Sequence, residues 1–470
     1  MIKREEGNTV LVSKLVRKGN SFILLVAASA ILGLSGCRNV AGLFVPVDYH
    51  SEVVSEGKSM LTGGQTGRLD RVLERLKSQS GTRSRLLYLL EAGRLLELAG
   101  DVEGSMRTYA EAEALLDEDL MRANLTVRGS AAQVASLATN DKALPYRGQL
   151  YERVLLYSFQ AMNDLETGDV AEARMALNKG LRDMRWGSDT IEKLSRENAA
   201  RLEREGIDTG GFPPLLNPSY PAANPEHSSD NPFLYYLSGL VHEVSGDLER
   251  AAIDYRNALA HAPGSPPVEH ALGSLNAREA GRARLVLVHE SDWVSPKIPF
   301  SFSIFLRNRS YTLSLPYYPD SPYYAVYPEQ FMEIGSHTPT LYPLLNLDAV
   351  VRRAHQEAFP AILLRQVLRI AAKQELQAEA EEADPWLGFA ASLYSILSDS
   401  PDLRSWQSLP SVISVSDSTL PEGTYPLRTG FNDQPVLDIH LQSGTVTVLR
   451  LVTAQGALIK VESFSLPLYK

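Results

Sequence analysis

The sequence predicts an α+β protein in which an α-helical solenoid is followed by a mixed region and a small C-terminal β-sandwich-like module. Two observations lead to this prediction. Before residue 280, a pattern of two helices joined by a Gly-Asp turn appears three times. After residue 409, five short runs typical of strands follow one another at regular spacing. We therefore expect a helical domain at 49–280, a mixed β/α region at 281–400 and a β module at 401–470.

The three helical segments align on their turns. These turns lie at Gly100-Asp101, Gly168-Asp169 and Gly246-Asp247, with roughly 70 residues between successive turns. In each segment a small residue stands seven positions before the turn glycine and another stands twelve positions after it. Small side chains let two antiparallel helices approach closely. We expect the glycine to end the first helix and the aspartate to cap the second.

This pattern resembles the tetratricopeptide repeat, most clearly in the third segment, which carries Gly239, Tyr255 and Pro263. The alternative is a set of ordinary helical hairpins that share a type of turn. Because the turns are about twice as far apart as in a tandem array of ~34-residue repeats, additional helices must lie between them. One is expected at 189–205, and residues 49–77 are expected to form a degenerate first hairpin.

Between the second and third segments lies a Pro-rich excursion at 206–232. Its six prolines and three glycines exclude helix over most of its length. It is either a flexible surface loop or a lid. Further on, residues 283–290 and 299–306 are typical of strands, and residues 347–384 predict a long helix with a boundary or kink at Pro360.

The N-terminus predicts a secretory signal peptide at residues 1–36. Residues 22–34 form a 13-residue apolar run after five basic residues. A helix of this length is ~20 Å long, too short for the ~30 Å hydrocarbon core of a membrane. The run ends in Leu34-Ser35-Gly36-Cys37, which resembles the bacterial lipobox.

That resemblance implies cleavage after Gly36 and lipidation of Cys37, the only cysteine of the chain. The alternative is a buried structural cysteine that happens to follow an apolar run. Residues 37–48 would then be a lipid-anchored tether, since two or three acyl chains anchor a protein stably. Arg38 occupies the position where an aspartate favours the inner membrane. The resemblance thus implies the periplasmic face of the outer membrane.

The charge of the chain limits its partners. Without residues 1–36 it keeps 41 Lys and Arg (46 − 5) and 54 Asp and Glu (56 − 2), a net charge of −13. Such a protein is a poor nucleic-acid binder. With no second cysteine there is no disulfide framework, so the body must be held by its own core.

We find no catalytic motif. His242-Glu243 lacks the second histidine of a zinc-protease helix, and no phosphate-binding loop is present. His289-Glu290 combines a base with an acid, but neighbours in sequence do not make a triad. We expect no enzyme, no metal and no cofactor. Replacing His242, His289 or Glu290 by alanine is expected to leave function near wild type and to cost only about 1 kcal/mol of stability.

Two groups of residues are candidates for binding. Arg365, Arg369 and Lys373 repeat every four residues along the predicted long helix, a row that suits acidic neighbours or an anionic ligand. The other group lies in the Tyr/Pro-rich stretch 311–328, whose rings either stack on a sugar or peptide or cover a sheet edge. Its candidates are Tyr317, Tyr318, Tyr323 and Tyr324.

The order of these features resembles an uncharacterised family of Gram-negative outer-membrane lipoproteins with a tetratricopeptide-like N-terminal half. Residues 146–169 and 231–247 carry most of this resemblance. We expect a scaffold that binds an unknown protein in cell-envelope assembly, with the concave face of the solenoid and the β module as docking surfaces. The alternative is a glycan-binding or glycan-processing factor for peptidoglycan or an exported polysaccharide.

Overall fold

The computed structural model describes residues 51–78, 83–126, 145–204, 228–276, 280–306, 309–318, 332–383 and 401–468, all within the unit Tyr49–Lys470. The predicted signal peptide, Gly36, Cys37 and the tether lie outside these residues, as does most of the excursion at 206–232. Within the described ranges, no helix combines the length and the hydropathy that a membrane span requires.

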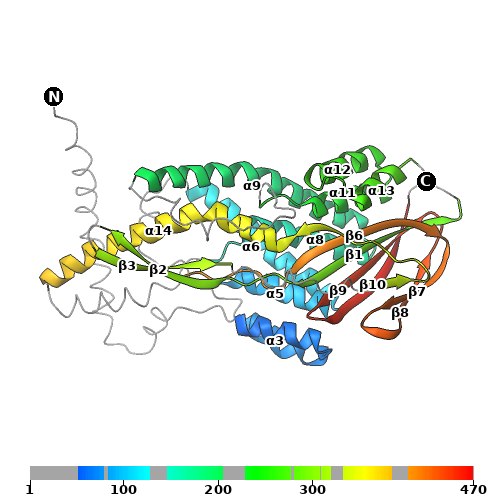
Figure 1. The fold of residues 1–470 in the computed structure, drawn as a ribbon, viewed down its shortest axis with the longest axis horizontal. Helices are drawn as coiled ribbons and strands as arrows, with labels where there is room; N and C mark the ends of the chain where they lie inside the picture. Colours follow the sequence, from blue (N-terminus) through cyan, green and yellow to red (C-terminus); the bar gives the residue numbers. More distant parts are fainter. Residues whose placement is uncertain are drawn as a thin grey trace. The chain divides into compact units, whose positions relative to one another are not determined.

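Helices fill the first half of the described chain, as predicted (Figure 1). Two short helices form the expected degenerate hairpin, and three longer hairpins follow, each with a Gly-Asp turn. The helices are α3 (Ser51–Thr62), α4 (Leu69–Ser78), α5 (Arg85–Leu98), α6 (Val102–Thr126), α8 (Leu150–Glu166), α9 (Val170–Arg204), α11 (Pro232–Val244), α12 (Leu248–His261) and α13 (Pro266–Ser274), with a 3-10 turn η2 (Thr66–Arg68) between the first two.

The three Gly-Asp turns end one helix and begin the next in the same way. Each turn glycine lies in the left-handed region that favours glycine, with φ of 89° at Gly100, 84° at Gly168 and 80° at Gly246. The aspartate that follows accepts a hydrogen bond from the backbone N–H three residues further on, at 2.8 Å for Asp101, 3.0 Å for Asp169 and 3.2 Å for Asp247. The predicted glycine stop and aspartate cap are confirmed.

The described strands form three sheets. The largest has five strands in the order β10-β9-β1-β6-β5, with β1 parallel to β9 and the other pairs antiparallel. A second sheet has the order β4-β7-β8, and β2 and β3 form a two-stranded ribbon. The strands are β1 (Arg282–Trp293), β2 (Ile298–Leu306), β3 (Arg309–Tyr317), β4 (Met332–Ile334), β5 (Tyr342–Asn346), β6 (Pro410–Pro421), β7 (Gly423–Thr429), β8 (Asn432–Leu441), β9 (Thr445–Ala454) and β10 (Ala457–Pro467).

The five-stranded sheet is covered on both faces. On β1, Val286 and Val288 belong to one apolar core with the hairpin helices, whereas Leu285 and Leu287 belong to another core with the β4-β7-β8 sheet. Successive side chains of a strand point to opposite faces, so a strand buried on both sides is apolar throughout. The layers are therefore helices, five-stranded sheet and three-stranded sheet.

The strands do not separate at the expected boundary near residue 400. β1 and β5 from the mixed region lie in the same sheet as β6, β9 and β10, and β4 pairs with β7. In Figure 1 the green strand β1 accordingly runs among the orange and red strands. Residues 401–470 are thus not a separate sheet, because strand alternation predicts which side chains face inward but not which strand is the neighbour.

Two helices continue where the sequence suggested an interruption. α9 runs from the second Gly-Asp turn through the helix expected at 189–205 without a break. α14 (Leu347–Ala383) includes Pro360 within the helix. A proline inside a helix costs about 3 kcal/mol or more. The packing of α14 against α9, β3 and β6 opposes that cost.

Candidate functional site

The first helix of each hairpin faces the five-stranded sheet. All 13 residues of α11 are buried, whereas four of the 14 residues of its partner α12 are. α5 and α8 are likewise buried over most of their length. β1 and β9 supply the apolar face against which these helices pack, so this side of the hairpins is covered by the chain's own sheet.

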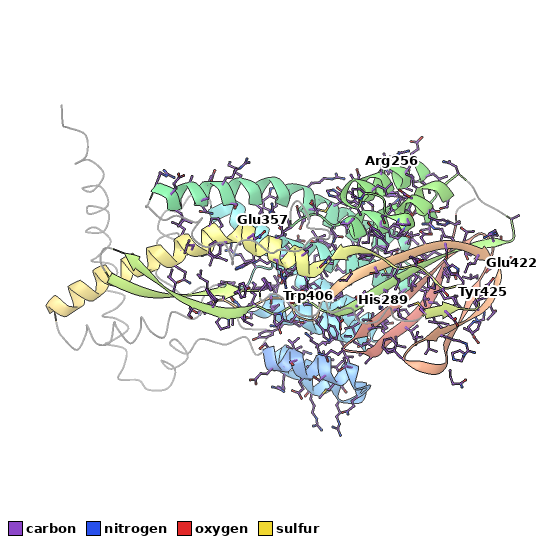
Figure 2. The ribbon with its side chains drawn as sticks, in the orientation of Figure 1. Arg256, His289, Glu357, Trp406, Glu422 and Tyr425 are labelled. Carbon is purple, nitrogen blue, oxygen red and sulfur yellow. The ribbon has the colours of Figure 1, made fainter. Side chains whose placement is uncertain are left out.

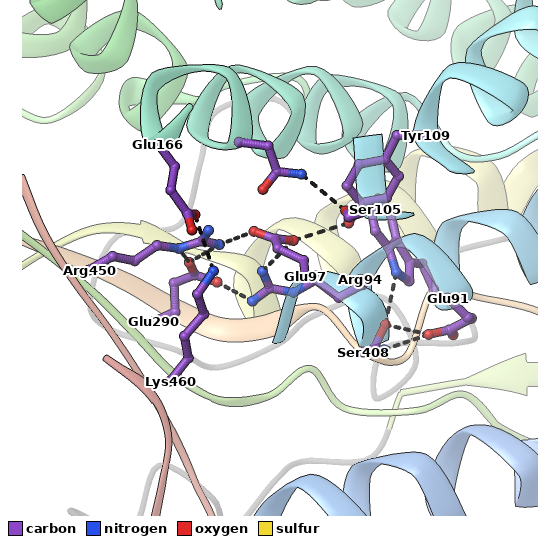
Figure 3. A network of polar contacts seen from close by, with 12 residues as sticks. Glu91, Arg94, Glu97, Ser105, Tyr109, Glu166, Glu290, Ser408, Arg450 and Lys460 are labelled. Carbon is purple, nitrogen blue, oxygen red and sulfur yellow. Dashed lines mark hydrogen bonds and ion pairs between the residues drawn. The ribbon is translucent and has the colours of Figure 1, made fainter. Parts of the chain in front are cut away.

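A buried cluster of charges joins α5 to the sheet (Figure 3). Glu97 pairs with Arg94 and with Arg450 of β9, and Glu290 of β1 pairs with both arginines. Arg94 Nη1 lies 3.0 Å from Glu97 Oε2, and Arg450 Nη2 lies 2.7 Å from Glu290 Oε1. Burial alone would raise the pKa of Glu97, but Arg450 and Arg94 outweigh it and hold that pKa at about 2. Glu97 therefore stays ionised inside the protein.

A second buried cluster joins α11 to the sheet. Arg284 of β1 pairs with Glu243 of α11 and with Asp417 of β6, and Arg284 Nη2 lies 2.6 Å from Asp417 Oδ2. His270 of α13 adds a contact, with Nδ1 2.8 Å from Asp417 Oδ1. Burial opposes ionisation of Asp417, yet Arg284 and the surrounding hydrogen bonds hold its pKa below the usual range.

The two clusters use the same position of the hairpin. Glu97 and Glu243 each stand three residues before the turn glycine. Each accepts a hydrogen bond from a tyrosine nine residues after that glycine, from Tyr109 Oη at 3.3 Å and from Tyr255 Oη at 2.9 Å. The sheet arginines that meet these carboxylates, Arg450 and Arg284, come from β9 and β1, which are neighbours in the sheet. A duplicated Glu–Tyr pair thus binds two adjacent strands.

The same tyrosines explain the small residues of the first helices. A Cβ atom on Gly93 would lie 2.4 Å from the ring of Tyr109, and one on Gly239 would lie 2.6 Å from the ring of Tyr255. No side chain fits at such distances. In these two hairpins, the predicted close approach of the helices is therefore confirmed.

Residues 402–409, which we call the strap, run without helix or strand between the hairpins and the sheet. Carboxylates from two first helices hold its backbone. Glu91 of α5 accepts hydrogen bonds from the N–H groups of Gln407 at 2.6 Å and Ser408 at 3.1 Å, and Glu152 of α8 accepts one from Trp406 at 2.8 Å. The strap is not part of a sheet, so these carboxylates provide the hydrogen-bond acceptors that its buried backbone N–H groups need.

Trp406 is the apolar anchor of the strap. It is among the largest fully buried side chains, and Figure 2 labels it in the region where helices and sheet meet. Its ring meets Tyr109 of α6 and Phe159 of α8 edge to face, with centroids 6.1 Å and 5.9 Å apart. The strap thus ties two hairpins together.

The predicted tyrosines divide between surface and interior. Tyr317 is half-buried, and its ring lies 5.9 Å from that of Phe300 on β2. Tyr318 is buried against His355 of α14, with Lys297 Nζ 6.0 Å from its ring. Tyr318 is therefore not an open stacking platform. Tyr323 and Tyr324 lie outside the described residues.

The predicted basic row lies on α14. Arg365 is half-buried there. Arg369 and Lys373 also belong to α14, but their side chains lie outside the part of the chain that the structure describes.

The two histidines singled out in the sequence are both buried. His242 is buried with Nε2 3.7 Å from Asp254 Oδ2, and burial lowers its pKa. His289 is buried on β1, with Nε2 2.9 Å from Thr453 Oγ1. Among the described residues, no three His, Cys, Asp or Glu side chains form a group that could hold a metal ion.

Comparison with known proteins adds little. No family model matches the chain, and no curated protein sequence matches it. Among solved structures, a tetratricopeptide repeat protein from Parabacteroides merdae is similar at 12% sequence identity, over 48% of this chain and 98% of that one, with a TM-score of 0.13. A likeness at this TM-score carries no argument about function.

Proposed function

We propose that this chain is an outer-membrane-anchored periplasmic lipoprotein that serves as a non-enzymatic, protein-binding scaffold in cell-envelope assembly, with tetratricopeptide-like hairpins. The sequence Leu34-Ser35-Gly36-Cys37 supports the anchor. The buried charge clusters support a rigid body rather than a catalytic one, because their ionised groups are occupied with one another.

The proposed binding role rests on the exposed apolar side chains on the outer face of α9. Met175 and Trp186 are 49% and 59% exposed there. Protein interfaces often cover large apolar side chains that are exposed on a helix. Tryptophan is enriched among the residues that dominate binding energy. We therefore assign docking to the outer faces of the hairpins, since their inner faces are occupied by the sheet.

The anchor is tested by Cys37→Ser. We expect an unprocessed precursor without lipid, measured by acyl-chain labelling and by fractionation of the envelope. If the variant is cleaved at the same place and still partitions with outer membranes, the proposed anchor is refuted.

The scaffold role is tested by co-purification of the full chain with envelope proteins. We expect Trp186→Ala to lose a partner that wild type and Ile298→Ala both retain, because Ile298 is also an exposed apolar residue (40%) but lies on β2. A partner retained by Trp186→Ala with unchanged yield would contradict docking at α9.

A glycan role is the second candidate, and the Phe300–Tyr317 pair favours it. Phe300 is 40% exposed beside the half-buried ring of Tyr317. An exposed aromatic pair can stack on a sugar. Sedimentation with purified peptidoglycan that is lost in Phe300→Ala would favour this role over the scaffold, and no sedimentation of wild type would remove it.

A further inference from the structure

The outer face of α9 is cationic as well as apolar. Met175, Arg182 and Trp186 stand at i, i+7 and i+11, which places them on one side of the helix. Arg182 Nη2 donates to Asp183 Oδ1 on the same helix at 3.0 Å, yet the Arg182 side chain is still 60% exposed. Arg174 and Arg185 beside this row are exposed too. Between residues 174 and 186 there are four cationic side chains and one acidic one, a local charge of +3 (4 − 1), on a chain whose total charge is −10.

Helix α12 carries further arginines near this face, of which Arg250 is paired with Asp247 at 3.4 Å. Burial raises the pKa of Asp254 on α12, and the charges of Arg185 on α9 and Arg250 on α12 both oppose that rise. The two arginines therefore lie near the same carboxylate. Ile253 and Arg256 are exposed on α12, and Figure 2 labels Arg256 on the outer side of that helix. We call these residues the α9–α12 surface: Arg174, Met175, Arg182, Arg185, Trp186, Arg250, Ile253 and Arg256.

The cations assigned to this surface are all arginines, because Lys179 is paired with Glu113 of α6. A guanidinium offers a planar fork of donors that matches a carboxylate with two parallel hydrogen bonds, which a lysine does not. The exposed apolar side chains of Met175, Trp186 and Ile253 lie among these guanidinium groups. This combination suits a partner that presents several carboxylates together with an apolar side chain.

We infer that the α9–α12 surface binds an acidic segment of a partner protein, with an apolar side chain of that segment against Trp186. The inference rests on the proposed scaffold role and names the chemistry of its partner. Arg182 and Arg185 would pair with carboxylates of the segment. Such charge pairs make binding sensitive to salt.

An anionic membrane surface is the less suitable occupant. A helix that lies in a membrane interface buries a broad apolar face in the lipid. The apolar face of α9 is already used inside the protein, since Ala173, Leu177, Leu181 and Met184 are buried. Towards solvent it offers Met175 and Trp186 among charged and polar residues, which is too little apolar area for insertion.

The test places a photo-crosslinking amino acid, p-benzoylphenylalanine, in the full-length lipoprotein in cells. Asn178 is exposed on α9 between Met175 and Arg182, so it is the probe position. Arg107 on α6 is the control position, because its side chain is 70% exposed and also pairs with an acidic residue of its own helix. We expect an adduct from position 178 that maps to an acidic segment of another protein, and none from position 107.

The mapped segment is then synthesised and its affinity measured by fluorescence anisotropy. We expect Arg182→Gln combined with Arg185→Gln to weaken binding at least tenfold, with the loss shrinking as salt rises from about 0.1 to about 1 M. Trp186→Ala should also weaken binding about tenfold or more, and Arg107→Gln should leave it unchanged. Melting curves show whether each variant is folded.

Four outcomes overturn the inference: adducts with lipid alone, a mapped segment that is neutral or basic, equal affinity in all variants, or no adduct from position 178. If a partner co-purifies with wild type but is mapped to a different surface, the scaffold role stands and the acidic-segment inference falls. If no partner is found by either method, both fall.

Discussion

The outer two hairpins and the middle hairpin use the same turn but meet the sheet differently. In α5–α6 and α11–α12, a glutamate three residues before the turn glycine and a tyrosine nine residues after it bind an arginine of the sheet. In α8–α9 these two positions are Leu165 and Leu177, both buried and apolar. The middle hairpin contacts β10 through the Glu166–Lys460 pair, and like α5 it holds the strap through a carboxylate, that of Glu152.

The same hairpin structure thus contacts the sheet in two different ways. The turn, the cap and the close approach of the helices are shared, so they belong to the hairpin itself. The position three residues before the glycine decides whether a buried glutamate meets an arginine of the sheet there. The middle hairpin has Leu165 at that position and reaches the sheet through Glu166, the next residue. A buried glutamate at that position requires an arginine opposite, which makes the pairing between helix and strand specific.

The largest effect is expected for Glu290→Ala. This change leaves Arg94 and Arg450 with Glu97 as their closest buried carboxylate, and removal of one partner of a buried ion pair typically costs about 3–5 kcal/mol. The sequence alone suggested about 1 kcal/mol, so the structure corrects that expectation. Urea unfolding measures the loss. The neighbouring change His289→Ala is the control, and a loss of about 1 kcal/mol or less in both variants would refute the buried cluster.

A smaller effect is expected for Gly239→Ala. The added methyl group would lie 2.6 Å from the ring of Tyr255, so the ring and the helix must shift. Overpacking of this kind costs about 1–3 kcal/mol. Gly273→Ala on α13 is the matched control, because its Cβ would meet nothing within 4 Å and alanine favours helix. Equal melting temperatures of the two variants would contradict the helix contact.

Tyr255→Phe should cost about 1–3 kcal/mol. The change removes the hydroxyl that donates to the buried carboxylate of Glu243 at 2.9 Å. Tyr157→Phe in the middle hairpin is the comparison, because the buried Tyr157 hydroxyl has no hydrogen-bond partner among the described residues. Urea unfolding should show a loss for Tyr255→Phe and almost none for Tyr157→Phe. Equal losses would mean that the outer hairpins owe nothing to the Glu–Tyr pair.

The smallest expected effect is a pH dependence of the free energy of unfolding that arises from Asp164 in the middle hairpin. Burial, with Glu172 and Asp169 adding to it, raises the pKa of Asp164 from 3.8 to about 7. The folded protein therefore holds a proton there that the unfolded chain releases. This contribution to stability is lost as pH rises from about 4 to about 7. In Asp164→Asn it is absent, so the variant should gain stability relative to wild type over that range and level off above it. Urea unfolding at several pH values measures the difference, and a constant difference would contradict the buried acid.

Local features of the fold could be predicted from the sequence. The turn glycines, the capping aspartates and the five C-terminal strands depend on residues close in the chain, and the structure confirms them. Positive φ at Gly246 and the cap at Asp247 need no distant partner to be favourable. The same holds for the degenerate hairpin of α3 and α4.

The contacts between the two halves could not be predicted in the same way. Arg284 and Arg450 each interrupt an apolar strand, and Glu97 and Glu243 share a position of the repeat. Arginines inside apolar strands and glutamates at a shared repeat position both indicate buried charges. Nothing in the sequence pairs them, because Arg450 lies more than three hundred residues from Glu97 and the order of the strands is set by packing. The covered face of the helices and the buried place of Tyr318 follow from that same packing.

The central claim is that hairpins and sheet form one cooperative body through these contacts. Native-state hydrogen exchange in increasing urea tests it most directly, because it gives an opening free energy for each element. We predict that amides of α5, α11, β1 and β9 open at a common free energy that Glu290→Ala lowers for all of them together. Helices that stay protected after β1 and β9 have exchanged would contradict the claim.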